Sequence, residues 1–523
     1  MVIQPNVRGA RLVVKAIEDY GIKVVFGVTA THVLEIFHEL SKSKKIYTVF
    51  GRSDFNVSYM AEGYSRKTNT PGVCIVTGGP GIAQSIAALT TSWSDSSRLV
   101  IITSDVNSNA SVNRMGYPHE NYDTYNLAKS TGAFVSLVSN SNDVYKQVIK
   151  CFKNTEFGRP TPSVCVLTRD SITSRSNKII KKYKCIKKIP PVNNQNKYTN
   201  LYNRINKATR PIIIVGGGAV TSNSENLIRK FFDKICVNYV STALGKSAIN
   251  SKNKYFQGVL PNPESLYEVS KSDLVIALGT SFGRISTNDG KLLINGDLIQ
   301  VDIDSRELNR VYKASNSFND DLHNFLDSFN NFIRKKNKIV KKNSNYKPSY
   351  NKWVKVINNV FGERERINIV LDVTIPQSIF INNFHTNLFR KIYLPWNSQN
   401  LGYSYPASLG IKIASQNEKV ICIIGDGGIL YSLGELLTAK MHKINVCVIV
   451  FNNKSLGTIE KQQSNWIRNK NFGTKIDNTN FHEIANHFNF TNFNINSAKQ
   501  LDSILRDKSM FKKPSLIQID TRL

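Results

Sequence analysis

The sequence predicts an α/β protein made of three consecutive domains, each built on a parallel sheet. Its length of 523 residues suits about three domains of ordinary size. Apolar runs rich in Val and Ile, which are typical of strands buried on both faces, recur along the chain. Stretches with the helical spacing of apolar residues lie between these runs. Such alternation of strands and helices is typical of parallel sheets.

The first domain is expected over residues 1–172. Its predicted elements are helices at 9–20 and 31–40 and strands at 23–27, 73–77 and 99–103. A further helix includes residues 60–66, and the turn Gly78-Gly79-Pro80-Gly81 follows the strand at 73–77. A linker is expected over residues 173–192, because this segment is basic, has few strand signals and runs into Pro190-Pro191.

The middle domain is expected over residues 193–330 and the third domain over residues 351–523. The middle domain begins with a strand at 211–215 that ends in Gly216-Gly217-Gly218, and another strand is expected at 272–279. Lysine and asparagine dominate the segment between these domains, so a solvated and mobile linker is expected over 331–350. The chain closes on an expected strand at 514–520.

The segment 419–457 carries the clearest functional pattern. It reads as a buried strand at 420–424, a glycine turn with Asp426, a helix through Glu435 and Lys440, and a second buried strand at 446–451 that ends in Asn452-Asn453. The turn and the asparagine pair therefore lie at the same carboxyl edge of the sheet, where open α/β sheets bind ligands.

Each part of this edge has a matching role. The glycines at 425, 427 and 428 let backbone N–H groups approach a phosphate. Asp426 and Asn453 offer the hard oxygens that Mg²⁺ prefers. The pattern predicts a diphosphate held through magnesium. An ordinary βαβ unit, in which Asp426 caps a helix and the asparagines make a turn, is the alternative.

Gly425-Asp426-Gly427, then 24 residues, then Asn452-Asn453, resembles the signature of thiamine-diphosphate enzymes. The resemblance implies that Asp426, Asn453 and the main-chain carbonyl of Ser455 hold the metal, with Gly425, Gly427 and Gly428 at the diphosphate. Residues 60–66 and 76–81 resemble the pyrimidine-binding domain of the acetolactate-synthase-like branch, which implies Pro80 and Gly81 at the cofactor. It also implies a homo-oligomer, at least a dimer, because in this family the pyrimidine domain of one chain meets the diphosphate domain of another.

In this family a carboxylic acid hydrogen-bonds the aminopyrimidine ring and so lets the cofactor remove its own C2 proton. The resemblance places this acid at Asp54, where the family has a glutamate. The side chain is one methylene shorter, and a misplacement of roughly 1 Å can cost about 10²-fold in rate. Three interpretations of Asp54 are therefore open. It is a working acid with a short side chain, the remnant of a site that binds the cofactor but turns over poorly, or an exposed residue that caps the helix.

Asn400-Leu401-Gly402-Tyr403 resembles the segment that shapes the cofactor in this family. The resemblance puts Leu401 at the apolar wedge that bends the cofactor between its two rings. It puts the Gln399 carbonyl at the acceptor for the pyrimidine amine. A core leucine in a loop is the alternative.

Positions that face the substrate in this family depart from acetolactate synthases. Thr29-Ala30-Thr31-His32 stands where a proline and paired glycines are usual, and His119-Glu120-Asn121 stands where Phe-Gln-Glu is usual. The resemblance implies that His119 and Glu120 point toward the substrate, where a histidine can protonate an intermediate. A surface histidine is the alternative. These departures weaken the case for pyruvate as donor and acceptor.

The resemblance implies a thiamine-diphosphate- and Mg²⁺-dependent enzyme that acts on a 2-oxo acid, most like acetolactate synthase, with loss of CO₂ and then joining to a second carbonyl. A 2-oxo acid decarboxylase, a 2-hydroxyacyl lyase or a cofactor-binding protein with little turnover is the alternative. Acetolactate synthases carry FAD in the middle domain. Here the glycine run is weak evidence, and Gly258-Val259-Leu260-Pro261 replaces the usual glycine-histidine loop, so FAD is left open.

The formal charge of +31 raises nucleic acid or an anionic surface as a partner. Lysines are mixed with asparagines throughout, without a basic stripe of interleaved aromatics, so neither is expected. Seven scattered cysteines, mostly in apolar runs, indicate buried free thiols of a reducing compartment. Without an apolar leader or an apolar run of ~20 residues, a soluble cytoplasmic protein is expected.

Overall fold

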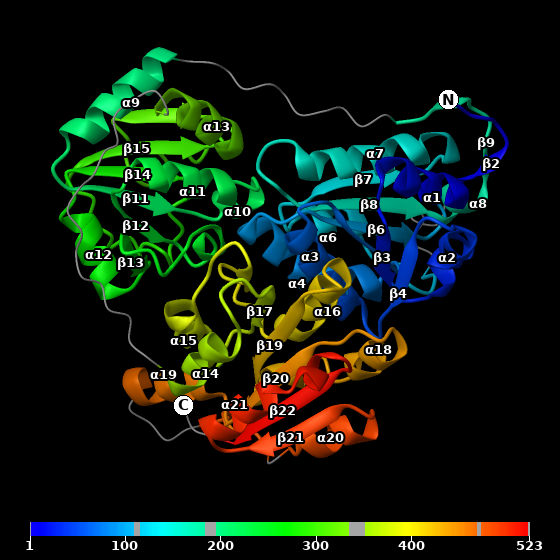
Figure 1. Ribbon diagram of the computed structural model, residues 1–523. Helices are drawn as coiled ribbons and strands as arrows, with labels where there is room; N and C mark the ends of the chain where they lie inside the picture. The colour runs from blue at the N-terminus through cyan, green and yellow to red at the C-terminus, as the bar shows by residue number, and fades with distance from the viewer. Residues whose placement is uncertain are drawn as a thin grey trace.

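The computed structural model describes residues 2–108, 116–183, 195–333, 351–467, 472–477 and 479–520, and in it the chain forms three six-stranded parallel sheets in sequence order. The N-terminal domain is blue to cyan, the middle domain green and the C-terminal domain yellow to red, and each packs against the other two (Figure 1). The predicted fold class is therefore confirmed. Most of the second expected linker, and with it the expected mobility, lies outside the described residues.

The N-terminal sheet has the strand order β4-β3-β5-β6-β8-β7. Side chains of α1, α2 and α7 pack on one face of this sheet, and side chains of α3 and α4 pack on the other. Its elements are α1 (Gly9–Tyr20), β3 (Val24–Gly27), η1 (Thr31–Val33), α2 (Leu34–Ser41), β4 (Tyr47–Phe50), α3 (Asp54–Thr68), β5 (Gly72–Val76), α4 (Pro80–Asp95), β6 (Leu99–Asp105), α6 (Thr124–Lys129), β7 (Phe134–Val138), α7 (Ser141–Glu156), β8 (Ser163–Thr168) and α8 (Arg169–Thr173).

Part of the expected first linker is paired with the chain's beginning. The strands β1 (Val2–Ile3) and β10 (Ile180–Lys181) form one antiparallel pair, and β2 (Val7–Arg8) and β9 (Arg175–Ser176) form another. Two-residue strands are too short to produce an alternation pattern in the sequence. Residues 184–194 of this segment lie outside the described residues.

The middle sheet has the strand order β13-β12-β11-β14-β15-β16, so the strands run outward in both directions from β11. The switch in direction lies between β11 and β14, where sheets of this kind leave a crevice. Its elements are α9 (Gln195–Lys207), β11 (Pro211–Val215), α10 (Gly218–Thr221), α11 (Glu225–Lys234), β12 (Asn238–Ser241), η2 (Lys246–Ala248), β13 (Phe256–Val259), α12 (Pro263–Ser270), β14 (Leu274–Leu278), β15 (Asp297–Asp302), β16 (Asn316–Asn319) and α13 (Leu322–Ile333).

The C-terminal sheet has the order β18-β17-β19-β20-β22-β21. Numbered along the chain, this is the same order as in the N-terminal sheet. Its elements are α14 (Lys352–Val360), β17 (Ile367–Leu371), α15 (Ile375–Asn383), β18 (Arg390–Tyr393), α16 (Ser404–Ala414), β19 (Lys419–Gly425), α17 (Asp426–Ile429), α18 (Glu435–Met441), β20 (Cys447–Asn452), α19 (Gly457–Gln462), η3 (Gln463–Ile467), α20 (Phe481–His487), β21 (Thr491–Ile495), α21 (Ala498–Arg506), η4 (Lys508–Phe511) and β22 (Ser515–Asp520).

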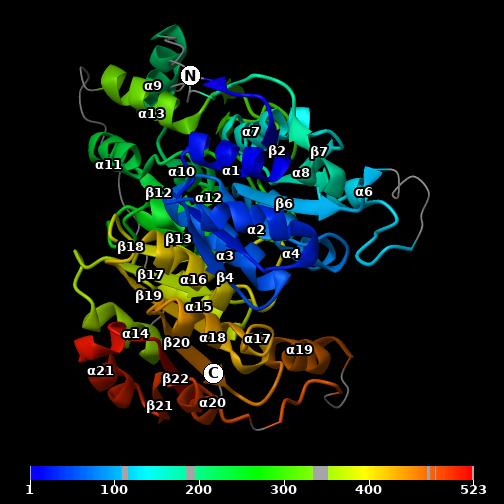
Figure 2. The same ribbon diagram turned by 90° about the vertical axis from the view of Figure 1, so that its right-hand side faces the viewer.

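Helix α3 lies against α16 and joins the N-terminal domain to the C-terminal domain (Figure 1). A Cβ at Gly63 would lie 2.3 Å from the carbonyl oxygen of Ala407, and a Cβ at Gly410 would lie 1.9 Å from that of Met60. Glycine alone permits backbones to approach this closely. In a view turned by 90°, α6 and α19, which follow the carboxyl edges of the two sheets, project from the same side of the molecule (Figure 2).

Two composition-based expectations can be compared with the structure. Six cysteines are free and buried, as predicted, while Cys185 lies outside the described residues. Across the described ranges, no helix is long and apolar enough to cross a membrane.

Candidate active site

The glycine turn and the asparagine pair meet at the carboxyl edge of neighbouring parallel strands, as predicted. Strand β19 pairs with β20, and Gly425 lies opposite Phe451, so Asp426 and Asn453 follow from adjacent strand ends. The Asp426 carboxylate accepts hydrogen bonds from the N–H groups of Gly427 at 2.9 Å and Ser455 at 3.2 Å. Burial raises the pKa of Asp426, and these backbone N–H groups oppose that rise.

The side-chain amide of Asn453 fits a cation. One of its two terminal atoms lies 2.8 Å from the Ser455 carbonyl oxygen and 3.3 Å from Asp426 Oδ1. If that atom is nitrogen, it donates to both oxygens. If it is oxygen, three oxygens converge without a donor, an arrangement that a hard cation stabilises. The donor set therefore suits Mg²⁺ in the second orientation.

The glycines of the turn leave no room for side chains. A Cβ at Gly427 would lie 2.7 Å from the Leu456 side chain, and a Cβ at Gly425 would lie 3.0 Å from Thr374. At Gly428, a Cβ would lie 3.2 Å from the carboxylate of Asp372. The turn therefore presents bare backbone at the carboxyl edge, which suits the close approach of a phosphate.

Asp54 is buried at the start of α3, with 9% of its surface exposed. The helix is capped by Ser53, whose side chain accepts a hydrogen bond from the Asn56 N–H, so the exposed-cap interpretation of Asp54 is wrong. Asp54 Oδ1 is a buried atom without a hydrogen-bond partner in the described part of the chain. Burial raises the pKa of this carboxyl, while the Thr77 backbone and the charge of His119 oppose the rise.

His119 lies in the loop that covers the Gly78–Gly81 turn. Its Nδ1 lies 3.4 Å from Thr77 Oγ1, and its ring is half-buried and packs against His32, which excludes a free surface histidine. Glu120 is engaged in its own loop, where Oε2 accepts a hydrogen bond from the Tyr117 N–H at 2.8 Å. Pro80 begins α4 at the surface, and Gly81 is buried against Asp54.

Three sequence profiles match in chain order. Residues 7–127 match the N-terminal TPP binding domain of thiamine pyrophosphate enzymes, residues 199–329 match the central domain, and residues 372–519 match the C-terminal TPP binding domain. The chain belongs to the thiamine pyrophosphate enzyme family. Asp426 and Asn453 lie within the third match and Asp54 within the first.

Individual relatives of this thiamine pyrophosphate enzyme are distant. The acetolactate synthase large subunit of Buchnera aphidicola subsp. Acyrthosiphon pisum is 27% identical over 87% of this chain and 84% of its own. That of Haemophilus influenzae is 24% identical over 98% and 94%. A solved structure, the thiamine diphosphate-dependent 4-hydroxybenzoylformate decarboxylase of Rhodococcus jostii RHA1, matches with a TM-score of 0.87 at 17% identity and covers 99% of both chains. This last likeness concerns the fold alone.

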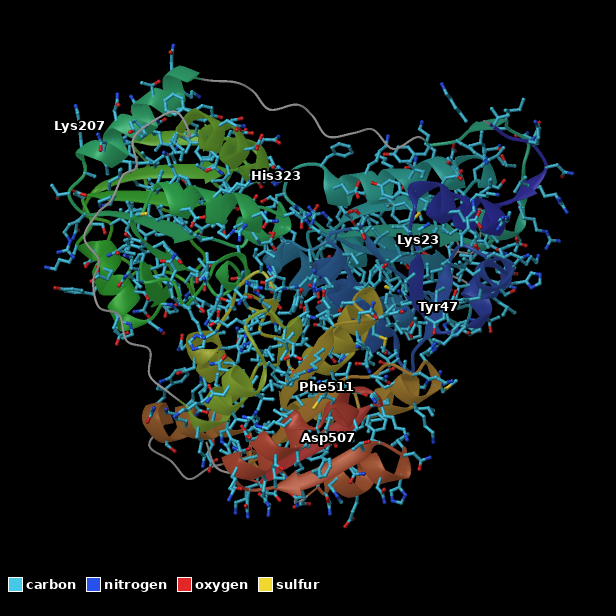
Figure 3. All side chains as sticks on the ribbon, viewed as in Figure 1. Lys23, Tyr47, Lys207, His323, Asp507 and Phe511 are labelled. Atoms are coloured by element: carbon cyan, nitrogen blue, oxygen red, sulfur yellow. The ribbon has the colours of Figure 1, made fainter. Side chains whose placement is uncertain are left out.

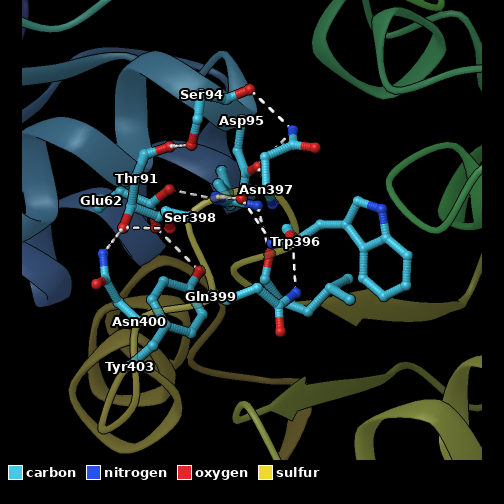
Figure 4. A network of polar contacts seen from close by, with 12 residues as sticks. Glu62, Thr91, Ser94, Asp95, Trp396, Asn397, Ser398, Gln399, Asn400 and Tyr403 are labelled. Atoms are coloured by element: carbon cyan, nitrogen blue, oxygen red, sulfur yellow. Dashed lines mark hydrogen bonds and ion pairs between the residues drawn. The ribbon is translucent and has the colours of Figure 1, made fainter. Parts of the chain in front are cut away.

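In this thiamine pyrophosphate enzyme, the segment before α16 is tied to the N-terminal domain (Figure 4). Asp95 accepts hydrogen bonds from the N–H groups of Trp396 and Asn397, both at 2.9 Å. Gln399 is exposed in a left-handed conformation with φ 52°, and Leu401 is half-buried. Other contacts of the network join Thr91 to Ser398 and Asn400, Tyr403 to Glu62, and Arg66 to both Glu62 and Asp95.

The sequence patterns did not reveal two buried carboxylates. They hold backbone segments near the carboxyl edges of the C-terminal and N-terminal sheets. Asp372, at the end of β17, accepts hydrogen bonds from the N–H groups of Gly402 and Ser404 at 3.0 and 2.9 Å. Glu435 of α18 accepts from the Arg52 N–H at 3.0 Å, two residues before Asp54. A carboxyl directly after an apolar run, as in Ile-Val-Leu-Asp372, was the available signal for Asp372.

Helix α18 and the loop after it also meet the N-terminal sheet. Tyr47 lies on the side of the N-terminal domain that faces the C-terminal domain (Figure 3). Its hydroxyl lies 2.8 Å from Nδ1 of His442, whose Nε2 lies 3.1 Å from the Phe50 N–H. Within the described ranges, no group of three or more His, Cys, Asp or Glu side chains is placed to hold a metal, so the amide and carbonyl oxygens beside Asp426 matter.

Proposed function

We propose that the protein is a thiamine-diphosphate- and Mg²⁺-dependent enzyme that removes CO₂ from a 2-oxo acid and, like acetolactate synthase, joins the remaining acyl group to a second carbonyl. The observation that carries the proposal is the convergence of Asp426, the Asn453 amide and the Ser455 carbonyl at a bare glycine turn. Bound thiamine diphosphate supplies a carbanion that adds to a carbonyl carbon and accepts the electrons released with CO₂.

The residues of the C-terminal domain bind and orient the cofactor. Asp426, Asn453 and the Ser455 carbonyl hold Mg²⁺, and the backbone of Gly425, Gly427 and Gly428 faces the diphosphate. The Gln399 carbonyl accepts a hydrogen bond from the pyrimidine amine, and Leu401 supports the bend between the rings. The hydrogen bonds of Asp372 to the 402–404 backbone support these positions, because they fix the segment relative to the metal site.

The N-terminal domain supplies the acid. Asp54 Oδ1 is buried without a hydrogen-bond partner in the described part of the chain, and the raised pKa of the carboxyl favours the protonated form that can donate to a ring nitrogen. Pro80 begins α4, and at Gly81 a side chain would contact this carboxyl, since a Cβ there would lie 3.1 Å from Asp54 Oδ1. The cofactor on one chain meets Asp54 of a second chain, so the working unit is at least a dimer.

A 2-oxo acid decarboxylase, in which the acyl group is protonated instead of joined, is the second candidate. The contact of His119 with Thr77 favours it, because the ring lies close to Asp54 and can carry a proton there. Glu120 takes a supporting position in the same loop.

A nucleotide in the middle domain belongs to the same proposal, with FAD as the first candidate. A cleft lies at the switch between β11 and β14 and is lined by Gly217, Gly279, Asp302, Arg98 and Arg159. The arginines suit a phosphate chain and Asp302 suits a ribose hydroxyl. Flavin absorbance in the purified protein would support FAD. A colourless protein that takes up no added FAD would contradict it.

Asp426→Ala tests the proposal. The variant removes a charged metal ligand, so Mg²⁺-dependent binding of thiamine diphosphate in titration calorimetry should be lost, together with CO₂ release from a panel of 2-oxo acids. Asp477→Ala, which removes an exposed carboxylate near the same edge, should change neither. Unchanged cofactor affinity in Asp426→Ala would contradict the metal site. Full affinity without CO₂ release by the unaltered protein would contradict the enzymatic proposal.

A further inference from the structure

The strand β4 lies at one edge of the N-terminal sheet, next to β3. On its inner side, the N–H group of Gly51 donates to the carbonyl oxygen of Gly27 at 3.1 Å. Successive N–H groups of an extended chain point in opposite directions, so those of Phe50 and Arg52 point away from the sheet. Edge strands present such unpaired N–H groups unless another part of the molecule covers them. The outer side of β4 therefore requires acceptors from elsewhere.

Two side chains of the C-terminal domain provide these acceptors. Glu435 on α18 accepts from the Arg52 N–H at 3.0 Å, and Nε2 of His442, the residue directly after α18, lies 3.1 Å from the Phe50 nitrogen. Glu435 and His442 are about two helical turns apart, so they lie on the same face. The strand β4 lies beside α18 in both ribbon views (Figure 1 and Figure 2). Side chains of one domain thus complete the sheet edge of another.

The contact with Phe50 fixes the protonation of the His442 ring. A backbone N–H group can only donate, so Nε2 accepts and carries no proton. The proton of the neutral ring is then on Nδ1, which lies 2.8 Å from the Tyr47 hydroxyl oxygen and donates to it. A charged ring would carry a second N–H group that points at the Phe50 N–H, and two donors would face each other. Protonation of the ring and the contact with Phe50 therefore exclude each other.

The surroundings of His442 favour the neutral ring. Burial lowers the pKa of His442 most, and the positive charge of Arg52 lowers it further. The ring therefore takes up a proton only below the ordinary histidine pKa of 6.5. The titratable and charged groups on the elements around the ring are Tyr47 on β4, Arg52 after β4, Glu435 and Lys440 on α18, and Lys443 after α18.

The backbone that His442 contacts leads directly to Asp54. Phe50 is the last residue of β4 and Asp54 is the first residue of α3, so only residues 51–53 lie between them. A Cβ at Gly51 would lie 2.3 Å from the Val57 side chain on α3, so this segment is packed tightly on the helix that carries Asp54. The position of the Asp54 carboxyl therefore depends on where the outer edge of β4 is held.

We propose that His442 is a positioning residue that holds the backbone before Asp54 while its ring is neutral and releases that backbone when its ring is protonated. The inference rests on the proposed function, in which Asp54 is the acid. The C-terminal domain thereby makes the placement of Asp54 in the N-terminal domain sensitive to pH. Full turnover requires the neutral ring, so CO₂ release should decrease in mild acid.

Nuclear magnetic resonance of the whole protein with isotope-labelled histidine tests the contact without substrate or cofactor. At about pH 8 the shifts of the two ring nitrogens of His442 should show a proton on Nδ1 and none on Nε2. Tyr47→Phe removes the acceptor of this proton and should move part of the population to the other tautomer. His487→Gln, at an exposed histidine in the last turn of α20, should leave the shifts unchanged. A proton on Nε2 in the unaltered protein would overturn the proposal.

Hydrogen–deuterium exchange measures how firmly the segment is held. At about pH 8 the Phe50 N–H should exchange about 10-fold faster in His442→Ala, as the loss of one hydrogen bond predicts. His442→Gln supplies an amide oxygen as acceptor and should keep most of the protection. Equal protection of this N–H in His442→Ala and in the unaltered protein would overturn the contact.

The same measurement at about pH 5 tests the release. The unaltered protein should lose protection of the Phe50 N–H relative to His442→Gln, because glutamine does not titrate. Chemical exchange also changes with pH, and burial raises the pKa of Glu435. Both effects are common to the two proteins and cancel in the comparison. Equal protection of the two proteins at both pH values would overturn the release.

CO₂ release tests the consequence for Asp54. At about pH 8 it should be about 10-fold lower in His442→Ala, since a misplacement of roughly 1 Å can cost about 10²-fold in rate, and His442→Gln should restore most of it. The ratio of the unaltered rate to that of His442→Gln should fall about 10-fold toward about pH 5, with its midpoint below 6.5. His487→Gln should keep the pH profile of the unaltered protein.

The outcomes separate this inference from the proposed function. A ratio that stays constant with pH, with CO₂ still released, would overturn the role of His442 and leave the proposed function intact. No CO₂ from any 2-oxo acid in the unaltered protein would overturn the proposed function and with it the effect of His442 on turnover. The tautomer and exchange results would then still decide whether the ring holds the edge of β4.

Discussion

Asp54 is the acid on which the proposed turnover depends. A Cβ at Gly81 would lie 3.1 Å from Asp54 Oδ1 and 2.8 Å from the methyl group of Thr77, so the carboxyl is packed on that side. Burial makes proton loss costly, which raises the pKa and favours the protonated acid. A short side chain can work here only if the packed helix start is held in place.

Asp54→Asn keeps the size of the side chain and removes the exchangeable acid. We expect CO₂ release to fall at least about 10²-fold while the affinity for thiamine diphosphate stays unchanged, as the loss of a general acid predicts. Titration calorimetry and a CO₂ assay measure the two quantities. Asp123→Asn, at the exposed cap of α6, is the control and should retain full activity. Activity that persists in Asp54→Asn would show that another group activates the cofactor.

At the residue scale, local motifs could be predicted and distant contacts could not. Asp426 and Asn453 are adjacent because neighbouring parallel strands bring them together, which the spacing reveals. Glu435 binds the Arg52 N–H across 383 positions, and Asp372 binds the Gly402 N–H across 30. The donor in each of these bonds is a backbone N–H group, which is present whatever the side chain of the donor residue is. Sequence patterns therefore do not predict such bonds.

Helix α18 couples the C-terminal domain to the start of α3. Glu435 is fully buried and accepts hydrogen bonds from the Arg52 N–H at 3.0 Å and the Thr438 hydroxyl at 2.6 Å. A Cβ at Gly51 would lie 3.3 Å from the Glu435 carboxylate. The backbone at the start of α3 is therefore held by a residue of the same chain. This contact holds the backbone that carries Asp54.

Glu435→Ala should weaken the contact between α18 and the start of α3. Donors left without an acceptor in a buried site cost about 1–3 kcal/mol, so the free energy of unfolding in urea should fall by that amount and CO₂ release should fall with it. The affinity for thiamine diphosphate should stay close to that of the unaltered protein. Glu435→Gln keeps an acceptor for Arg52 and should restore most of the activity. Equal losses in both variants would contradict a positioning role.

The contact between η2 and α15 buries a lysine. Lys246 is 1% exposed and its ammonium donates to the carbonyl oxygen of Ile381, and burial lowers its pKa to about 7. The unfolded chain holds this proton up to an ordinary lysine pKa near 10.5. Between these values the unfolded state binds more protons than the folded state, so stability increases with pH and is lost as pH falls toward 7.

Lys246→Met should remove that dependence. The free energy of unfolding of the unaltered protein should rise by about 3–4 kcal/mol relative to the variant between about pH 7 and about pH 10, since one pKa unit is worth about 1.4 kcal/mol. Urea titrations at several pH values measure the difference, and other titrating groups cancel because both proteins carry them. A constant difference across this range would show that Lys246 stays charged in the folded state.

At the element scale, buried strands were predictable and short irregular pieces were not. The strands β5, β6, β19 and β20 lie within one or two residues of their predicted places, because unbroken apolar runs fit only the interior of a parallel sheet. The helix expected at 31–40 begins as the separate turn η1, which tilts His32 inward. A single turn of helix has too few residues to show a period.

The whole molecule brings two sheets of equal strand order together through α3 and α16. The order in both domains could not be read from the sequence, because alternation of strands and helices fits several parallel sheets equally well. In the proposed function each sheet offers one half of a site, with the acid at the N-terminal edge and the metal ligands at the C-terminal edge. The proposed dimer completes each site with halves from two chains.

The central claim is that Asp426 of one chain and Asp54 of another serve the same cofactor. Mixing the inactive variants Asp54→Asn and Asp426→Ala, after dissociation and reassembly, tests it most directly. Half of randomly formed dimers are mixed and each has one intact site of two, so the account predicts recovery of about a quarter of the unaltered activity. No recovery in mixtures that demonstrably contain mixed dimers would contradict it.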